Sequence, residues 1–264
     1  MSGAEVYHRS FGTGPRQVLA VHCSLAHSGA WRGLAAEMDA EITLTGFDLL
    51  SHGRSPDWDG GGNYQSLNVA AGLELLREPV DLLGHSFGAT VALRMAAARP
   101  ELVKSLTLIE PVLFAVARVD QPEMLAAMEE ESGPIDAAWE AGDVELATRL
   151  FNRMWGPGEP RWPYLPEQLR AAMMRAMPVI PASYRTLYHD DTGTLEPETL
   201  ARVTMPALVV AGDVSPKVMP EIARGLARRL PEARAEIVAG AGHMLPVTHP
   251  GEGARLLREL WGQG

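Results

Sequence analysis

The sequence predicts an α/β fold in which a mostly parallel central sheet is flanked by helices. Short apolar runs bounded by Gly, Pro or Asp recur along the chain, and segments with helical periodicity separate them. The 264 residues, of which 46% are hydrophobic, suffice for a buried core without disulfides or metal. We therefore expect one core that is interrupted by an insertion.

Six runs have the pattern of buried strands. They are Val18–Val21, Ile42–Thr45, Val80–Leu83, Leu106–Ile109, Ala207–Val210 and Ala235–Val238. Four intervening segments carry the Leu and Ala repeats of helices with one buried face, namely Ser66–Arg77, Ala89–Ala98, Glu221–Leu230 and Gly251–Trp261. This alternation is typical of a parallel sheet with helices on both faces.

The alternation stops between Pro111 and Met205. Here we find only helix-like stretches, which are Glu123–Glu131, Asp136–Trp155, Pro166–Met177 and Ala182–His189. The many Met and Trp side chains of this segment are expected to pack against one another, or alternatively to line an apolar substrate pocket. We expect a core formed by residues 1–110 and 206–264 and a helical cap inserted at residues 111–205.

Charge and cysteine content exclude several classes of protein. The formal net charge of −10 would repel nucleic-acid phosphates and anionic headgroups, and no run approaches the roughly 18 apolar residues of a membrane span. We expect no nucleic-acid and no membrane partner. The single cysteine, Cys23, has no intrachain partner, and the start of the chain lacks a basic stretch followed by an apolar one. These features predict a cytoplasmic protein.

The strongest chemical signal is Gly84–Gly88, which reads GHSFG and matches G-x-S-x-G. It follows a predicted strand directly and precedes a predicted helix. A serine on such a sharp turn is held in a strained conformation, and the flanking glycines allow strand and helix to approach without a clash. The turn would expose the Ser86 hydroxyl, and the N–H groups at the helix start would favour a developing oxyanion.

With this motif the chain resembles the α/β-hydrolase family over nearly its whole length. The segment His22–Trp31 (HCSLAHSGAW) is similar to the family's His-Gly loop, and Asp48–Ser55 (DLLSHGRS) is similar to its Asp-x-x-Gly-His-Gly-x-Ser segment. Gly240–Met244 (GAGHM) lies where the family places its catalytic histidine. The resemblance implies an α/β-hydrolase fold, with oxyanion donors at the backbone N–H groups of Ser24 and Phe87.

A base is needed for Ser86, because a hydroxyl is a poor nucleophile at neutral pH and imidazole is the side chain best suited to accept its proton. Among eight histidines, His243 alone lies in a Gly-rich loop after the final predicted strand. We expect it to be the base. His22 and His85 are expected to shape loops, and the sequence assigns no role to the other five histidines.

The third member of the triad is less clearly marked. Most relatives carry the acid in a Gly-x-x-Asp loop after the strand that resembles Ala207–Val210, but here Ser215 stands at that position and Asp213 lies two residues early. Glu110 follows the preceding strand, where some branches of the family place the acid. We expect Glu110 to orient the imidazole, with Asp213 as the alternative.

Cys23 replaces the usual glycine of the oxyanion loop. A nucleophilic cysteine would need a neighbouring base and a lowered pKa, so we expect buried packing instead. No H-E-x-x-H, no G-x-x-x-x-G-K-[ST] and no G-x-G-x-x-G after a strand is present, so we expect neither a metal nor a cofactor.

Together these features predict a cofactor-independent serine hydrolase that forms an acyl-enzyme with a small or medium apolar ester, or with a related lactone or thioester. Two alternatives stay open. The same triad could cleave a carbon–carbon bond or transfer the acyl group to an acceptor other than water, and the fold could also serve a non-catalytic binding protein. The expected partner is a small-molecule substrate, and the oligomeric state is open.

Overall fold

The computed structural model describes residues 5–156, 158 and 160–262. Residues 1–4, at the start of the chain, and residues 263–264 belong to the predicted core and lie outside this description.

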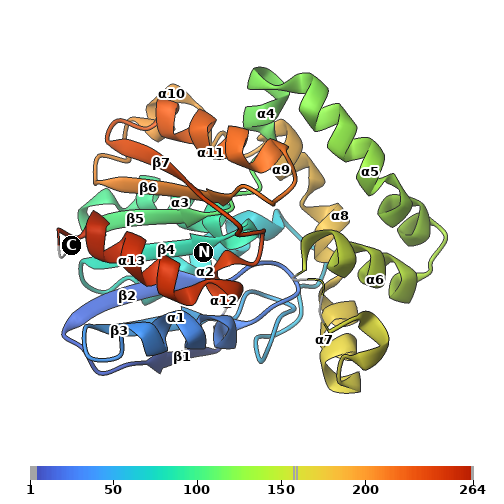
Figure 1. The fold of residues 1–264 in the computed structure, drawn as a ribbon, viewed down its shortest axis with the longest axis horizontal. Helices are drawn as coiled ribbons and strands as arrows, with labels where there is room; N and C mark the ends of the chain where they lie inside the picture. The colour runs from blue at the N-terminus through green and yellow to red at the C-terminus, as the bar shows by residue number, and fades with distance from the viewer. Residues whose placement is uncertain (1–4, 157, 159, 263–264) are drawn as a thin grey trace.

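A seven-stranded sheet in the order β1-β3-β2-β4-β5-β6-β7 forms the centre of the molecule (Figure 1). β1 pairs with β3 in antiparallel orientation, and all other neighbours are parallel. The predicted mostly parallel sheet is therefore confirmed.

Each predicted strand lies inside an observed one. The strands are β1 (His8–Phe11), β2 (Arg16–Val21), β3 (Ile42–Phe47), β4 (Val80–His85), β5 (Val103–Ile109), β6 (Ala207–Gly212) and β7 (Ala233–Val238). β1 was not predicted because its four residues, HRSF, alternate between exposed and half-buried and form no apolar run. It is an antiparallel edge strand that the apolar pattern cannot reveal.

Helices cover both faces of the sheet, and each face has its own apolar layer. One layer packs α2 (Tyr64–Leu75), α3 (Phe87–Ala98) and α11 (Val218–Arg229); the other packs α1 (Arg32–Glu37) and α13 (Pro250–Leu260), with α12 (Leu245–Thr248) beside it. Because both faces are covered, every residue of β4 and β6 is buried. No helix among the described residues has the length and apolarity to cross a membrane.

The described part of the segment between β5 and β6 consists of helices joined by turns and contains no strand. It forms α4 (Phe114–Asp120), α5 (Pro122–Glu140), α6 (Val144–Trp155), α7 (Glu167–Ala176), α8 (Val179–Ala182), α9 (Tyr184–His189) and α10 (Pro197–Leu200). In Figure 1, α5 to α8 lie to the right of the sheet, outside the two helical layers.

The helix break in this segment differs from the expected one. We expected separate helices at Glu123–Glu131 and Asp136–Trp155, but α5 continues through Pro134 and the chain turns at Gly142. The buried residues of α5 lie on both sides of Pro134, so tertiary packing outweighs the hydrogen bond that proline removes. Gly142 adopts a φ of 77°, which costs glycine little.

Candidate active site

Ser86 lies at the turn between β4 and α3 with φ 57° and ψ −120°, a conformation that non-glycine residues rarely adopt. The two flanking glycines make this turn feasible. A Cβ at Gly84 would collide with the backbone of Ala89, and one at Gly88 would collide with the Val21 carbonyl oxygen. The expected strand-to-helix elbow is therefore present, with its serine at the tip.

Three side chains from distant parts of the chain meet at this elbow. His243 Nε2 lies 2.9 Å from Ser86 Oγ, and His243 Nδ1 lies 3.0 Å from a carboxylate oxygen of Glu110. All three residues are buried. With Nδ1–H donating to the carboxylate, the lone pair of Nε2 is directed at the serine hydroxyl, which is the arrangement required for proton transfer.

Glu110 is held by further hydrogen bonds. Its Oε1 accepts from the backbone N–H of Gly212 at 2.6 Å and from the Ser215 hydroxyl at 2.7 Å, while Oε2 faces His243. Ser215, at the position where relatives usually carry the acid, thus supports Glu110 instead. Asp213, the alternative acid, accepts from the Gly240 N–H at 2.7 Å and connects two loops. The displacement by two residues directs its carboxylate to this loop rather than to His243.

The predicted oxyanion donors are close to the serine. Ser24 and Phe87 line the same cavity as Ser86. Phe87 is the first residue of α3, where an N–H group has no acceptor within the helix. Cys23 beside Ser24 is buried, and burial raises the pKa of its thiol to about 12. The thiol is therefore protonated and acts as packing, as expected.

Two buried histidines order the loops near the predicted oxyanion donors. The Leu49 N–H donates to His22 Nε2 at 3.0 Å, and the Leu25 N–H donates to His52 Nε2 at 2.9 Å. The other ring nitrogen of each faces a backbone carbonyl. Neither ring has a nitrogen left for a metal, and the described residues contain no group of three or more His, Cys, Asp or Glu placed to hold one.

The role of His22 agrees with the expected loop-shaping role, whereas sequence reasoning assigned none to His52. Its place inside Asp48–Ser55 was the signal available. His85 behaves as expected too, since its Nε2–H donates to the His243 carbonyl oxygen at 2.7 Å and fixes the backbone of that loop. Burial, followed by the neighbouring His243, lowers the pKa of His85 to about 3.

A cavity of about 230 Å³ opens onto Ser86. Its walls are mostly apolar and aromatic, and α4, α5, α6, α8 and α9 contribute Phe114, Ile135, Phe151, Trp155, Ile180, Leu187 and Tyr188. The Trp155 ring lies edge-on to His243 with 4.7 Å between ring centroids. The methionines Met128 and Met177 are buried in apolar clusters instead. Packing thus accounts for these two methionines, whereas Trp155 lines the pocket.

Two carboxylates also line this cavity. Glu129 is half-buried and Asp136 is exposed, and the Tyr184 hydroxyl lies 3.3 Å from Glu129 Oε1. Partial burial and the neighbouring Glu140 and Glu129 carboxylates raise the pKa of Asp136. The more exposed part of the pocket therefore carries two carboxylates, of which Glu129 has the Arg118 guanidinium 3.7 Å away, whereas the part near the serine is apolar.

Comparisons with known proteins agree with this fold. Residues 18–256 match the Alpha/beta hydrolase family. The pimeloyl-[acyl-carrier protein] methyl ester esterase of Methylococcus capsulatus is 30% identical over 260 residues, covering 94% of this chain and 95% of that protein. Lipase LipV of Mycobacterium tuberculosis is 41% identical over 105 residues, which are 38% of this chain and 39% of the lipase. The enol-lactonase from Burkholderia xenovorans matches in structure with a TM-score of 0.75 at 16% identity, over 97% of this chain and 96% of that chain. The resemblance of the motifs is thus confirmed: the chain belongs to the alpha/beta hydrolase family and is an enzyme of the hydrolase class.

Proposed function

We propose that this enzyme is a cofactor-independent serine hydrolase that cleaves small to medium apolar carboxylic esters through an acyl-enzyme on Ser86. The observation that carries the proposal is the hydrogen-bonded series from Glu110 through His243 to Ser86, next to an apolar cavity. The relatives named as esterase and lipase support an ester as the substrate.

In the proposed mechanism, Ser86 Oγ attacks the ester carbonyl carbon while His243 Nε2 accepts its proton. Glu110 stabilises the resulting imidazolium. The N–H groups of Ser24 and Phe87 stabilise the negative charge that develops on the carbonyl oxygen, and losing one such donor typically costs about 3 kcal/mol of barrier. The tetrahedral intermediate then expels the alcohol, which takes the proton from His243. Water, deprotonated by His243, releases the acid by the same steps.

The cavity supports the proposed substrate class. Its volume of about 230 Å³ lies below the range of pockets for drug-sized ligands, and its aromatic lining suits an apolar acyl chain. Asp136 disfavours an anionic group at the exposed end by charge repulsion, whereas Arg118 offsets the charge of Glu129. In this proposal residues 111–205 form a cap on the core of residues 1–110 and 206–264, the partner is a small neutral molecule, and the enzyme acts in the cytoplasm.

Covalent labelling tests this proposal. A fluorophosphonate probe is expected to label the wild type, and p-nitrophenyl esters of increasing chain length are expected to be hydrolysed. Ser86→Ala should lose both activities, whereas the control Ser10→Ala, at an exposed hydroxyl that pairs with Thr45, should keep them. An unlabelled and inactive wild type would favour the binding protein. Turnover of a vinylogous diketone well above that of any ester would favour carbon–carbon cleavage.

A further inference from the structure

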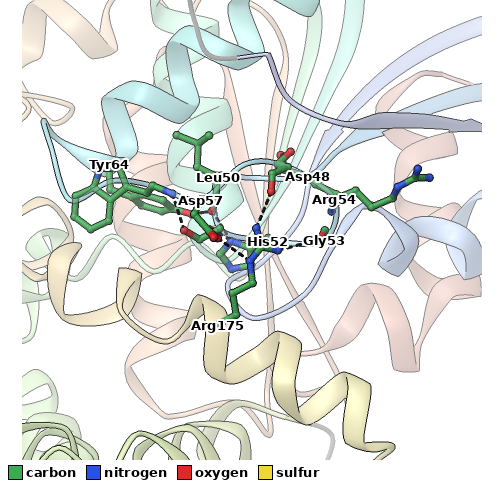
Figure 2. A network of polar contacts seen from close by, with 11 residues as sticks. Asp48, Leu50, His52, Gly53, Arg54, Asp57, Tyr64 and Arg175 are labelled. Carbon is green, nitrogen blue, oxygen red and sulfur yellow. Dashed lines mark hydrogen bonds and ion pairs between the residues drawn. The ribbon is translucent and has the colours of Figure 1, made fainter.

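Arg175, in the last turn of α7, contacts the loop that follows β3. Its guanidinium donates to Asp57 Oδ1 at 2.7 Å, to the Gly53 carbonyl at 3.0 Å and to the Ser55 carbonyl at 2.8 Å (Figure 2). A planar guanidinium matches several acceptors at once, and lysine cannot reproduce this geometry. One side chain therefore attaches a helix of the 111–205 segment to a loop of the core.

The contacted loop is tightly wound around a buried carboxylate. Asp48 accepts from the Ser28 N–H at 2.6 Å and from the Arg54 N–H at 2.8 Å. Burial acts to raise the pKa of Asp48, but these hydrogen bonds hold it below its usual range. Ser51 has a φ of 62°, and a Cβ at Gly53 would collide with the Asp48 carboxylate. Such a loop has little freedom to adjust, so a displacement of one end of the loop is transmitted to its other end.

His52 connects this loop to the oxyanion site. Its Nδ1–H donates to the Leu50 carbonyl at 2.9 Å, which leaves Nε2 to accept from the Leu25 N–H. Leu25 follows the proposed donor Ser24 directly and has a φ of 59°, a strained value for leucine. Burial and, less strongly, the Arg175 cation lower the pKa of His52 to about 4, so that Nε2 stays an acceptor at neutral pH.

Leu25 also packs against the helices of the 111–205 segment. Its side chain is 7% exposed and belongs to an apolar cluster with Ile135, Ala138, Ala147, Ala176 and Met177, which come from α5, α6 and the end of α7. Ala176 and Met177 directly follow Arg175. Two sets of contacts thus connect the end of α7 to the oxyanion loop. In the first, Ala176 and Met177 pack against Leu25. In the second, Arg175 binds the loop that carries His52, and His52 accepts from the Leu25 N–H.

We infer that Arg175 and His52 are positioning residues that couple the docking of α7 to the orientation of the Ser24 oxyanion donor. The inference rests on the proposed serine hydrolase function. Neither side chain lines the cavity at Ser86. Their removal should therefore weaken stabilisation of the transition state and leave ground-state binding of the ester nearly unchanged.

Steady-state kinetics of Arg175→Gln, His52→Phe and the double variant on a p-nitrophenyl ester test the inference. We expect kcat to fall about 10-fold in Arg175→Gln and about 100-fold in His52→Phe, with KM changed less than about 2-fold. The larger loss is about that of a donor misplaced by 1 Å, and the smaller one corresponds to a lesser displacement. In the double variant the loss should be smaller than the product of the single losses, because both act on one donor. Arg185→Gln is the matched control, since its side chain lies in the same segment and is 82% exposed.

A tetrahedral analogue separates positioning from a merely structural role. The Ki of a trifluoromethyl ketone that carries the same acyl chain should rise by the factor by which kcat falls, whereas the affinity for the acid product should not change. If Arg175→Gln raises KM at constant kcat and Ki, the contact only shapes the pocket and the inference is overturned. A loss of kcat in the double variant equal to the product of the single losses would overturn it as well.

Two further measurements keep these outcomes clear. If thermal unfolding shows that Arg175→Gln does not fold, the same kinetics are measured on Arg175→Lys, which keeps the positive charge but loses the planar guanidinium. A wild-type kcat in Arg175→Lys would then overturn the inference. Failure of the proposed function would appear differently, as a wild type without ester turnover or fluorophosphonate labelling.

Discussion

At the scale of single residues, the proposed triad depends on two strained turns at the ends of adjacent strands. Ser86 follows β4 with a φ of 57°, and Glu110 follows β5 with a φ of 51°. Each of these conformations costs about 1–3 kcal/mol and persists only where surrounding contacts enforce it. For Glu110 the contacts are its bonds to Gly212 and Ser215. In the proposed triad the acid therefore lies on the neighbouring strand, while Ser215, at the position where relatives usually carry it, donates to its carboxylate.

We expect Glu110→Gln to lower kcat by up to about 10⁴-fold, because a neutral amide no longer stabilises the imidazolium and can impose the wrong tautomer on His243. Asp213→Asn is the matched control and should change kcat little, since its carboxylate bonds to Gly240. Single-turnover measurements with a p-nitrophenyl ester check both. If Asp213→Asn were the more damaging change, the assignment of the acid would be wrong.

How far the sequence could predict this site depends on whether a residue's role is local. Ser86 and His243 were predictable because each lies in a short Gly-rich motif beside a strand. Glu110 followed from its place at a strand end. The lining of the pocket by Trp155 was one of two alternatives that the sequence left open. Arg175 was out of reach, because its role arises from contacts with residues far away in the chain. No local pattern distinguishes such side chains from ordinary helix surface.

At the scale of elements, a buried ion pair joins three strands. The Asp81 carboxylate in β4 accepts from Arg16 of β2 at 2.6 and 2.9 Å and from the Ser105 hydroxyl of β5 at 2.6 Å. Arg16 also stacks on the Trp261 ring, 4.2 Å from its centroid. A carboxylate in a fully buried strand is costly unless it is paired in this way.

We expect Asp81→Ala to lower the free energy of unfolding by about 3 kcal/mol, since it leaves the partly buried Arg16 without its carboxylate partner. The kcat for esters should stay unchanged, because Asp81 lies in the early part of β4 and the elbow follows its end. Urea denaturation checks the stability, with the exposed Asp39→Ala as control, expected within about 0.5 kcal/mol of the wild type. Equal stability of the two variants would contradict a structural role for this pair.

The elements themselves show where sequence patterns fail. The six predicted strands were recognisable by their short apolar runs. β4 and β6 are buried throughout, as expected of strands covered on both faces, whereas β7 at the sheet edge is mostly half-buried. β1 lacked such a run, and the course of α5 through Pro134 depends on apolar contacts on both sides of the proline that no local propensity encodes. Local signals identified the core, whereas packing decided the edge strand and the boundary between α5 and α6.

At the scale of the whole molecule, three histidines are buried in the folded state without a charge. Burial lowers the pKa of His22 and of His85 to about 3 and that of His52 to about 4, from an ordinary value of 6.5. All three also hold loops of the site through hydrogen bonds to the backbone. The stability of the fold and the proposed oxyanion geometry therefore both depend on these imidazoles being neutral.

The sign of the pH dependence follows from these shifts. Below pH 6.5 the unfolded chain binds protons at these three sites, while the folded protein does not until about pH 4 to 3. The unfolded state therefore gains protons and stability falls as the pH falls through this window. Between pH 6.5 and 5 each histidine contributes a loss of between about 1 and 2 kcal/mol, because the slope reaches roughly 1.4 kcal/mol per pH unit only where the unfolded imidazole is fully protonated.

We therefore expect the free energy of unfolding to drop by about 5 kcal/mol between pH 6.5 and 5, because three sites act together. Urea denaturation at several pH values measures this slope. His85→Gln should reduce this slope by the contribution of one proton, since glutamine can still donate to the His243 carbonyl but does not titrate. The control His189→Gln, at an exposed position, should leave the slope unchanged. A stability that stays level down to pH 5 would mean that the folded protein takes up these protons, and the buried imidazoles could not then be neutral.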